Sequence, residues 1–220
     1  MIAFCNTIQV QGRSKRVLSI SVFLASALMG CVPYQWFDRV GYFNMAPRLA
    51  YQGFSFDRPP NPRWYMRQSE ESHTNVLLRR DLADPTKTHS FYAEVGLRSI
   101  EKQPETHAEF AELARVPPEK ADYEVEHVAY EQQLTTRQNQ WCIRFDSSDL
   151  VRGAPSAPKA ELTMKVGGYR CLHPAWPKVT LDFYYSERGL PTELSPELAD
   201  EGETFLNGVR IDIAPDTPAS

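Results

Sequence analysis

The sequence predicts an α+β fold in which two helices pack on a mainly antiparallel sheet. Several short segments alternate between apolar and polar residues, as strands with one buried face do. Two other segments carry apolar residues at helical spacing and are bounded by residues that start and end helices. The strand segments come in runs and do not alternate with helices, which favours this class over a parallel sheet. With 42% hydrophobic and 24% charged residues, the 220-residue chain suits one globular domain with appendages, not a disordered or fibrous protein.

Four strands are expected in the first half of the globular part. The first is the short segment GFSF, which begins at Gly53 and ends at the proline-rich run 58–62, because proline cannot continue a ladder. Two more, at 63–68 and 75–80, flank a polar turn. The clearest strand is 90–100. Its apolar residues recur at every second position, as expected where one face is buried: Phe91, Ala93, Val95 and Leu97.

The two helices are expected at the middle and at the end of the domain. The first runs from Pro104, at its first position, to the residue before Pro117, because proline fits the first turn of a helix and ends the last one. Its apolar stripe consists of Phe110, Leu113 and Ala114. The second follows Ser195, a good N-cap, with Pro196 at the first helical position. Its buried face is expected to hold Leu198, Gly202, Phe205, Leu206 and Val209.

Between the helices, the alternating pattern predicts four further strands, at 123–132, 140–146, 162–171 and 179–185. The polar, proline-containing segment 147–160 is expected to form a loop, and Gly167-Gly168 a β-bulge. Strands with one apolar face each form a sheet with one covered face and one more open face.

The N-terminus has the pattern of a secretory signal. Residues 1–16 carry three basic side chains and no acidic one, and an uncharged run follows from Val17 to Gly30. This run is shorter than the ~20 apolar residues that a membrane-spanning helix needs. The run ends in Leu-Met-Gly-Cys, which resembles the lipobox of bacterial lipoproteins. The resemblance implies that diacylglycerol is attached to Cys31 and that the chain is cut before this cysteine. The alternatives are an ordinary cleaved signal peptide and an uncleaved anchor.

Lipidation at Cys31 implies a place in the cell envelope. Bacterial lipoproteins retained in the inner membrane tend to carry aspartate after the cysteine. Val32 takes that position here, which favours the outer membrane, facing the periplasm. Removal of residues 1–30 changes the formal net charge from −4 to −7, because it removes three basic and no acidic residues. Anionic headgroups repel such a chain, so the lipid and not a basic patch would hold it at the membrane.

The expected domain organisation follows from these segments. Residues 1–30 are a lipoprotein signal peptide, 31–52 a lipidated N-terminus and connector, 53–213 a single globular α+β domain, and 214–220 a flexible tail. Cys142 and Cys171 are then the two cysteines of the mature domain, an even pair in an oxidising compartment. Both fall on the strand face opposite the apolar residues, so we expect a structural disulfide. The alternative is two buried thiols.

The motifs of common catalytic and metal sites are absent from the sequence. None of the five histidines stands in an HxH, HExxH or CxxC arrangement, and no GxSxG or phosphate-loop pattern occurs. We therefore expect no catalytic residue, no metal and no cofactor. The acidic pI, near 5.8, argues against a nucleic-acid partner, which needs a basic face.

One group of residues suits an interaction face. Charged side chains and a glycine follow the strand 179–185, in the segment Ser-Glu-Arg-Gly, and aromatic and arginine side chains line the presumed open face. The candidate interaction face consists of Tyr92, Arg98, Tyr184, Glu187 and Arg188. The alternatives are a surface turn at 187–188 and an ordinary covering of the sheet beneath a loop.

Four segments resemble those of an uncharacterised family of bacterial lipoproteins: GFSF, YRCLHP, YYSERG and ELADEGETFLNGVR. The order of elements resembles the PsbP-like fold, an α/β sandwich used for accessory subunits. The lipoprotein family has no assigned activity, so that resemblance implies the class and no chemistry. The lipobox, the absence of catalytic motifs and the PsbP-like resemblance together favour a non-catalytic binding or accessory module that is anchored by lipid and docks on an envelope protein. Two alternatives are a small-molecule or lipid binder, whose open face is roofed by the 147–160 loop, and an enzyme of unrecognised type. Partner binding predicts an exposed apolar patch, and ligand binding a concave pocket.

Overall fold

The computed structural model describes residues 38–68, 74–82, 86, 88–115 and 124–212. They all belong to one compact unit. The predicted signal peptide, Cys31 and the predicted tail 214–220 lie outside the described residues. Within those residues, no helix has the length and apolar character needed to span a membrane.

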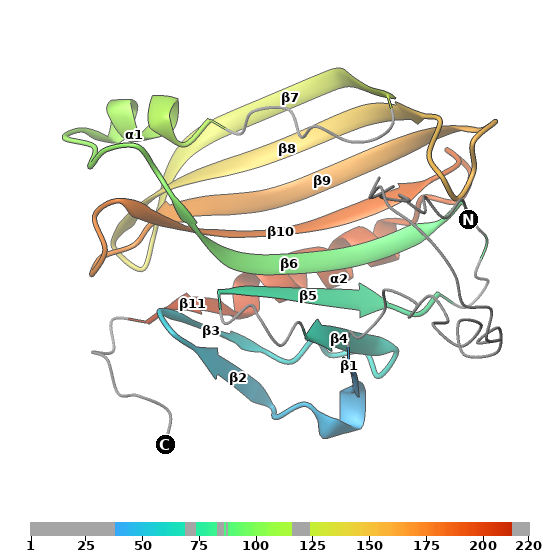
Figure 1. Ribbon diagram of the computed structural model, residues 1–220, viewed down its shortest axis with the longest axis horizontal. Helices are drawn as coiled ribbons and strands as arrows, with labels where there is room; N and C mark the ends of the chain where they lie inside the picture. Colours follow the sequence, from blue (N-terminus) through green and yellow to red (C-terminus); the bar gives the residue numbers. More distant parts are fainter. Residues whose placement is uncertain (1–37, 69–73, 83–85, 87, 116–123, 213–220) are drawn as a thin grey trace, which may run out of the picture. The chain divides into compact units, whose positions relative to one another are not determined.

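An eight-stranded sheet forms the larger layer (Figure 1). Its strands lie in the order β1-β4-β5-β6-β10-β9-β8-β7, and every neighbouring pair is antiparallel. Their bounds are Asp38–Gly41 (β1), Trp64–Gln68 (β4), Asn75–Arg80 (β5), Ser90–Ser99 (β6), Glu124–Arg137 (β7), Gln140–Arg152 (β8), Glu161–Leu172 (β9) and Val179–Gly189 (β10). The predicted antiparallel sheet is thus confirmed.

A second, three-stranded sheet and two α-helices pack around the large sheet. The small sheet has the order β11-β3-β2, with β2 at Arg48–Tyr51, β3 at Phe54–Asp57 and β11 at Val209–Ile211. The helices are α1, His107–Leu113, and α2, Pro196–Gly208, and a 3-10 helix spans Tyr42–Asn44. The predicted α+β class with two helices is confirmed.

The two α-helices lie on opposite faces of the large sheet. The main core joins α2 and the small sheet to one face, through Phe56, Phe183 and Leu206. A smaller cluster joins α1 to the other face, where Phe110 packs on Ile143. We call this second side the α1 face. α1 covers this face near the start of β8. A small apolar cluster covers the same face near the end of β8. That cluster consists of Val151, Ala154 and Leu162, with partly buried Ala157, Ala160 and Met164 packed against it.

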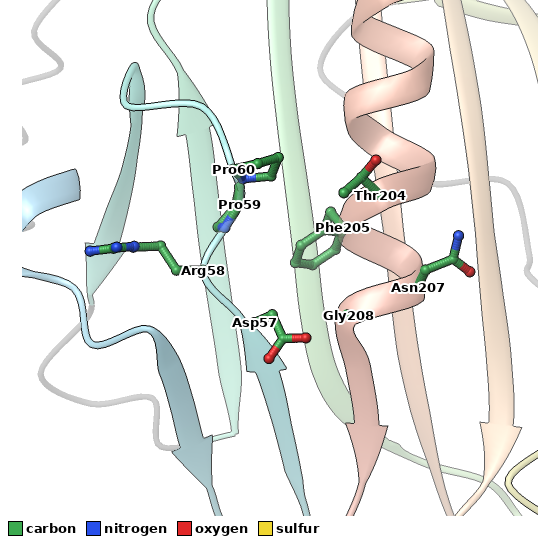
Figure 2. A pocket seen from close by; sticks show the side chains of 8 residues that line it. All are labelled: Asp57, Arg58, Pro59, Pro60, Thr204, Phe205, Asn207 and Gly208. Carbon is green, nitrogen blue, oxygen red and sulfur yellow. The ribbon is translucent and has the colours of Figure 1, made fainter.

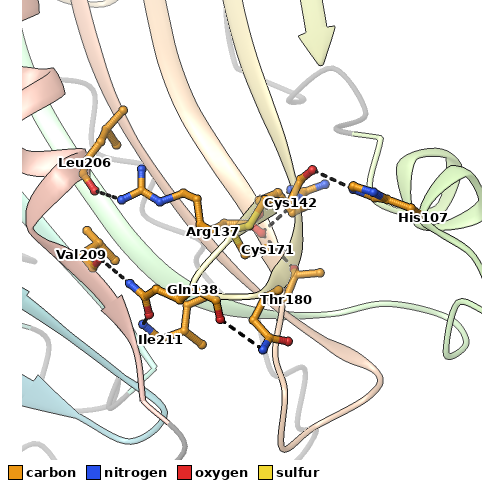
Figure 3. The surroundings of a disulfide bond; sticks show 12 residues. His107, Arg137, Gln138, Cys142, Cys171, Thr180, Leu206, Val209 and Ile211 are labelled. Atoms are coloured by element: carbon orange, nitrogen blue, oxygen red, sulfur yellow. Dashed lines mark hydrogen bonds and ion pairs between the residues drawn. A yellow bond between two sulfur atoms is a disulfide. The ribbon is translucent and has the colours of Figure 1, made fainter. Parts of the chain in front are cut away.

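The predicted disulfide is present and joins β8 to β9 (Figure 3). Cys142 lies directly opposite Cys171 in the ladder, with the two Cα atoms 4.0 Å apart, and both residues are fully buried. They point away from Ile143, as their position in the strand predicts, and into the main core. The nearby β7–β8 turn is tied to the end of α2, because Arg137 donates to the Leu206 carbonyl at 3.0 Å.

Two expectations about the middle strands are wrong. β7 and β8 both extend well beyond the predicted ends, so the loop predicted at 147–160 begins only after Arg152. Residues 147–152 pair with β7 on one side and β9 on the other, and this pairing overrides their polar character. No bulge occurs at Gly167-Gly168, where the register is continuous. Glycine is needed there for space, because a Cβ on Gly168 would lie 2.5 Å from the Cβ of Tyr184.

The first helix starts later than predicted. Thr106, not a residue before Pro104, is the N-cap, and its hydroxyl accepts a hydrogen bond from the Glu109 N–H at 3.1 Å. The second helix begins as predicted, with Ser195 as the N-cap and Pro196 as the first helical residue, but the Ser195 side chain makes no capping hydrogen bond. The helix ends at Gly208, so Val209, predicted on its buried face, is instead the first residue of β11.

The globular unit also begins before the predicted boundary at Gly53. β1 pairs with β4, β2 pairs with β3, and Met45 between them is buried in the main core. The part of the predicted connector from residue 38 onward therefore belongs to the fold. Aromatic and aliphatic side chains without a clear period hid these two short strands from sequence reasoning.

Candidate functional site

Four of the five predicted interaction residues lie on the α1 face. Tyr92 and Arg98 come from β6, and Tyr184 and Arg188 come from its neighbour β10. The rings of Tyr92 and Tyr184 meet edge to face, with centroids 6.3 Å apart. Tyr184 also donates its hydroxyl hydrogen to Glu94 at 2.5 Å. The structure thus brings the two tyrosines together in the middle of the sheet.

Glu187 lies on the other side of β10. It is buried on the α2 side, where its Oε1 lies 2.9 Å from His89 Nε2 and accepts a hydrogen bond from the Ser195 backbone N–H. β10 continues through Gly189, so alternation places Glu187 and Arg188 on opposite faces of one strand and not in a turn. Glu187 therefore anchors the N-terminus of α2 and contributes nothing to the α1 face.

Arg98 belongs to a largely buried ion-pair network. Its Nε lies 3.2 Å from Asp182, which is buried and also accepts a hydrogen bond from Arg170 Nε at 2.8 Å. Arg170 donates as well to the carbonyl of Ala114, at the C-terminus of α1. This network holds α1 on the sheet, and Arg98 extends it to the surface. Arg98 is thus part of the scaffold of the face.

Two buried polar atoms on the α1 face have no hydrogen-bond partner. They are Ser186 Oγ and Arg188 Nε, two positions apart on β10. Among the described residues these are the buried side-chain nitrogen and oxygen atoms left unpaired. Arg188 makes one long hydrogen bond, from Nη2 to Ser156 Oγ at 3.4 Å. Buried polar groups are nearly always hydrogen-bonded in folded proteins. The two atoms therefore indicate a position on this face where a hydrogen-bond partner is missing.

The strand register places a third group in the same row of the face. This row crosses four neighbouring strands. It runs from Arg188 on β10 to Met164 on β9, then to Asp149 on β8 and His127 on β7. Asp149 is buried, 2.7 Å from His127 Nδ1, and its other oxygen accepts the Ser147 hydroxyl at 3.0 Å. Sequence reasoning missed this pair, because it placed Asp149 in a loop.

His127 and Asp149 do not form a catalytic triad. Ser147 donates to the carboxylate and not to the imidazole, so the pair activates no hydroxyl nucleophile. No group of three or more His, Cys, Asp or Glu residues in the described part of the chain is arranged to hold a metal ion. The pair is better suited to hold β7 against β8.

A small pocket of about 300 Å³ lies between β3 and α2 (Figure 2). It is lined by Asp57, Arg58, Pro59, Pro60, Thr204, Phe205, Asn207 and Gly208. Its two charged side chains are already used in the scaffold. Asp57 pairs with Arg48 at 2.9 Å, and Arg58 donates to the carbonyls of Tyr42 and Met45. The pocket is at the lower size limit of ligand sites, and no charged group in it lacks a partner.

Exposed apolar side chains concentrate on β7. Of the large hydrophobic residues exposed in the described chain, three lie on this strand: Val128 at 61%, Tyr130 at 43% and Leu134 at 45%. The other two, Phe43 and Leu190, lie elsewhere. An apolar strip on an edge strand agrees better with partner binding than with a ligand pocket.

Comparisons with known proteins leave the family open. No family model and no curated protein matches the chain. The similar solved structures include a mutant of the protein Mog1, with 12% identity and a TM-score of 0.33, over 80% of this chain and 96% of that one. They also include the Saccharomyces cerevisiae Ran-binding protein Mog1p, with 13% identity and a TM-score of 0.34, over 80% and 95%.

Proposed function

We propose that the chain is a lipid-anchored, periplasm-facing lipoprotein that acts as a non-catalytic accessory module of the bacterial envelope. In this proposal it binds an envelope protein through the α1 face. The observation that carries the proposal is the pair of unpartnered buried atoms, Arg188 Nε and Ser186 Oγ, on that face. They lie beside the two tyrosines predicted to form an interaction surface.

The chemistry of Arg188 indicates what the partner presents. A buried guanidinium N–H without an acceptor costs about 1–3 kcal/mol. Arg188 is itself partly exposed, so an acceptor that docks on its guanidinium can recover part of this cost. A carboxylate suits this role, because it accepts two parallel N–H bonds from arginine. We therefore expect an acidic side chain of the envelope protein to lie against Arg188, flanked by Tyr92 and Tyr184. Arginine and tyrosine are among the residue types that most often dominate such interfaces.

The location in the envelope rests on two features that support each other. The lipobox resemblance at Cys31 implies export and acylation. The Cys142–Cys171 disulfide agrees with export, since disulfides persist in oxidising compartments and are rare in the cytosol. The residue after Cys31 favours the outer membrane. The PsbP-like sandwich remains part of this proposal, supported by the order of strands and helices.

The lipid anchor is tested by Cys31→Ala. The variant lacks the thiol that receives diacylglycerol, so we expect it to move from the membrane pellet to the soluble fraction of fractionated cells. Several acyl chains bind a membrane far more firmly than the few contacts of one protein face, because each buried methylene contributes about 0.8 kcal/mol. Cys5→Ala is the matched control and should leave the distribution unchanged. Retention of Cys31→Ala in the pellet after a salt wash would contradict the anchor.

The interaction face is tested by Arg188→Glu. A crosslinked pull-down from native membranes, read by mass spectrometry, should recover one envelope protein with the wild type. We expect roughly tenfold less of it with Arg188→Glu, because the partner's carboxylate would meet a like charge in place of arginine. Arg63→Glu makes the same charge change at an exposed position on the connection before β4, and should retain capture. Equal capture by both variants contradicts docking on the α1 face, and no captured protein at all favours the ligand-binding alternative.

A further inference from the structure

β7 is a long edge strand. It is the last strand in the order of the large sheet, and within the described residues it pairs with β8 alone. The unpaired N–H and C=O groups of an edge strand can recruit another strand, and proteins usually protect such edges with proline, lysine or a short strand. β7 has 14 residues and neither proline nor lysine. Its bulge lies near one end, at 127–129, and its regular part from Ala129 to Arg137 carries one acidic residue, Glu131. This part exposes Tyr130 and Leu134, at 43% and 45%.

The turn after β7 determines which backbone groups point outward. Gln138 and Asn139 both have positive φ, 50° and 62°, as in a two-residue type I′ hairpin turn. The residues that flank such a turn, Arg137 and Gln140, form a hydrogen-bonded pair. Hydrogen-bonded and non-bonded pairs alternate along an antiparallel ladder. The N–H and C=O groups of every second residue therefore face away from β8: those of Tyr130, Gln132, Leu134 and Thr136.

A bulge limits this outward segment at its other end. The register between β7 and β8 shifts between His127 and Ala129, so Val128 is the extra residue. His127 is held at the bulge by its 2.7 Å contact with the buried Asp149. The regular part of the edge thus runs from Ala129 to Arg137. It ends at the bulge on one side and at the turn on the other.

This segment is self-complementary in antiparallel pairing. If Gln132 of one copy lies opposite Gln132 of a second copy, each Tyr130 lies opposite the other copy's Leu134. Both pairs join exposed apolar side chains on the same face, and aromatic–aliphatic pairs of this kind stabilise sheets. All three positions have outward N–H and C=O groups, so the pairing supplies hydrogen bonds to each of them. The segment from Ala129 to Thr135 then forms a ladder without a bulge.

We propose that the regular segment of β7 is the docking site of a second copy of this chain, in antiparallel register about Gln132. The two large sheets become continuous across a two-fold axis. This short ladder buries less surface than the roughly 800 Å² per partner of a standard interface. The dimer is therefore weak and forms where the chain is concentrated. This surface is separate from Arg188, and the proposal does not depend on lipidation or on an envelope partner.

A single added cysteine tests the register. In the full-length chain, Gln132→Cys places the new thiol opposite itself, with Cα atoms about 5.5 Å apart, within the range of a disulfide. Gln133→Cys is the matched control, because its Cα lies about 8 Å from its symmetry mate, beyond that range. After mild oxidation in intact cells, we expect a covalent homodimer from Gln132→Cys on a non-reducing gel. The parent chain and Gln133→Cys should stay monomeric.

A charge swap in the Gln132→Cys background tests the side-chain pairing. Tyr130→Lys with Leu134→Lys places lysine opposite lysine twice, and we expect roughly tenfold less dimer. Tyr130→Lys with Leu134→Glu places lysine opposite glutamate twice, which should restore most of the yield. Both double variants change exposed side chains, so neither is expected to disturb the fold. Thiol labelling checks this, because a folded variant keeps the Cys142–Cys171 bond and leaves both cysteines unlabelled.

The remaining outcomes overturn the proposal. Equal dimer from Gln132→Cys and Gln133→Cys indicates random collision. A Gln132→Cys adduct with a different protein indicates that another chain occupies the edge. Loss of dimer in both charge variants alike indicates another register. Failure of the Arg188 interface would leave this crosslink unchanged, because the β7 edge does not include Arg188, so the two proposals fail independently. Failure of the lipid anchor would leave Cys31 as a free thiol, and dimer in the parent chain would then reveal its contribution.

Discussion

Replacing Asp182 by asparagine is expected to lower the free energy of unfolding by about 3–5 kcal/mol. Asp182 is buried at 4% exposure and accepts hydrogen bonds from Arg170 Nε at 2.8 Å and Thr180 Oγ at 2.9 Å. Arg170, itself at 7%, keeps its charge in the variant. The amide NH2 of asparagine would face the guanidinium N–H groups, donor against donor, and leave a buried charge without a counter-ion. Urea unfolding of the purified protein, followed by fluorescence, measures the change.

Asp146→Asn is the matched control for this prediction. Asp146 also pairs with an arginine, at 2.7 Å from Arg144 Nη2, but its side chain is 52% exposed. Water and salt screen the pair, and Arg144 keeps its second partner, Glu203. We expect a loss below about 1 kcal/mol. If Asp182→Asn costs no more than Asp146→Asn, the buried network is not what holds α1 on the sheet.

The Cys142→Ala, Cys171→Ala double variant is expected to lose about 3–4 kcal/mol of stability. The bond closes a loop with a sequence separation of 29 residues, and the chain-entropy model assigns that amount to a loop of roughly this length. The bond also fixes the register between β8 and β9, where the two cysteines are opposite each other. A reductant should lower the unfolding midpoint of the wild type and leave that of the double variant unchanged.

The contrary result for the disulfide is equally clear. If wild type and double variant unfold at the same urea concentration, oxidised and reduced alike, the hairpin register holds without the bond. The ladders that pair β9 with β8 and with β10 would then account for it.

Local patterns were sufficient to predict most of the fold. The strand at 75–80 agrees with β5 at both ends, and the strand at 90–100 agrees with β6 to within a residue. Both have one buried face, so their side chains alternate in polarity. β7 is exposed on both faces over most of its length, so its polarity does not alternate and its end was predicted too early. In β8, Ser147 and Asp149 are polar residues on a packed face, so their polarity predicts a loop where the structure has a strand.

The candidate site was predictable only in part, for a similar reason. Alternation within one strand places Tyr184 on the same face as Arg188, and it also separates Glu187 from them once the end of β10 is known. It does not show which strands are neighbours. The contact between Asp149 and His127, 22 positions apart, and the missing partners of Ser186 and Arg188 depend on strand order.

Periodicity was enough to predict the fold class, and the Ser-Pro pair at 195–196 was enough to predict the start of the second helix. The pairing of Cys142 with Cys171 followed from the cysteine count together with the lipobox resemblance at Cys31. The lipobox resemblance at Cys31 is also a property of the sequence alone. Tertiary structure decided the lengths of β7 and β8, the position of the bulge and the side of the sheet to which Glu187 points. It also decided which strand is left at the edge. Strand pairing joins residues that are distant in sequence. The interactions that stabilise these features are therefore made with strands that a local sequence pattern cannot identify.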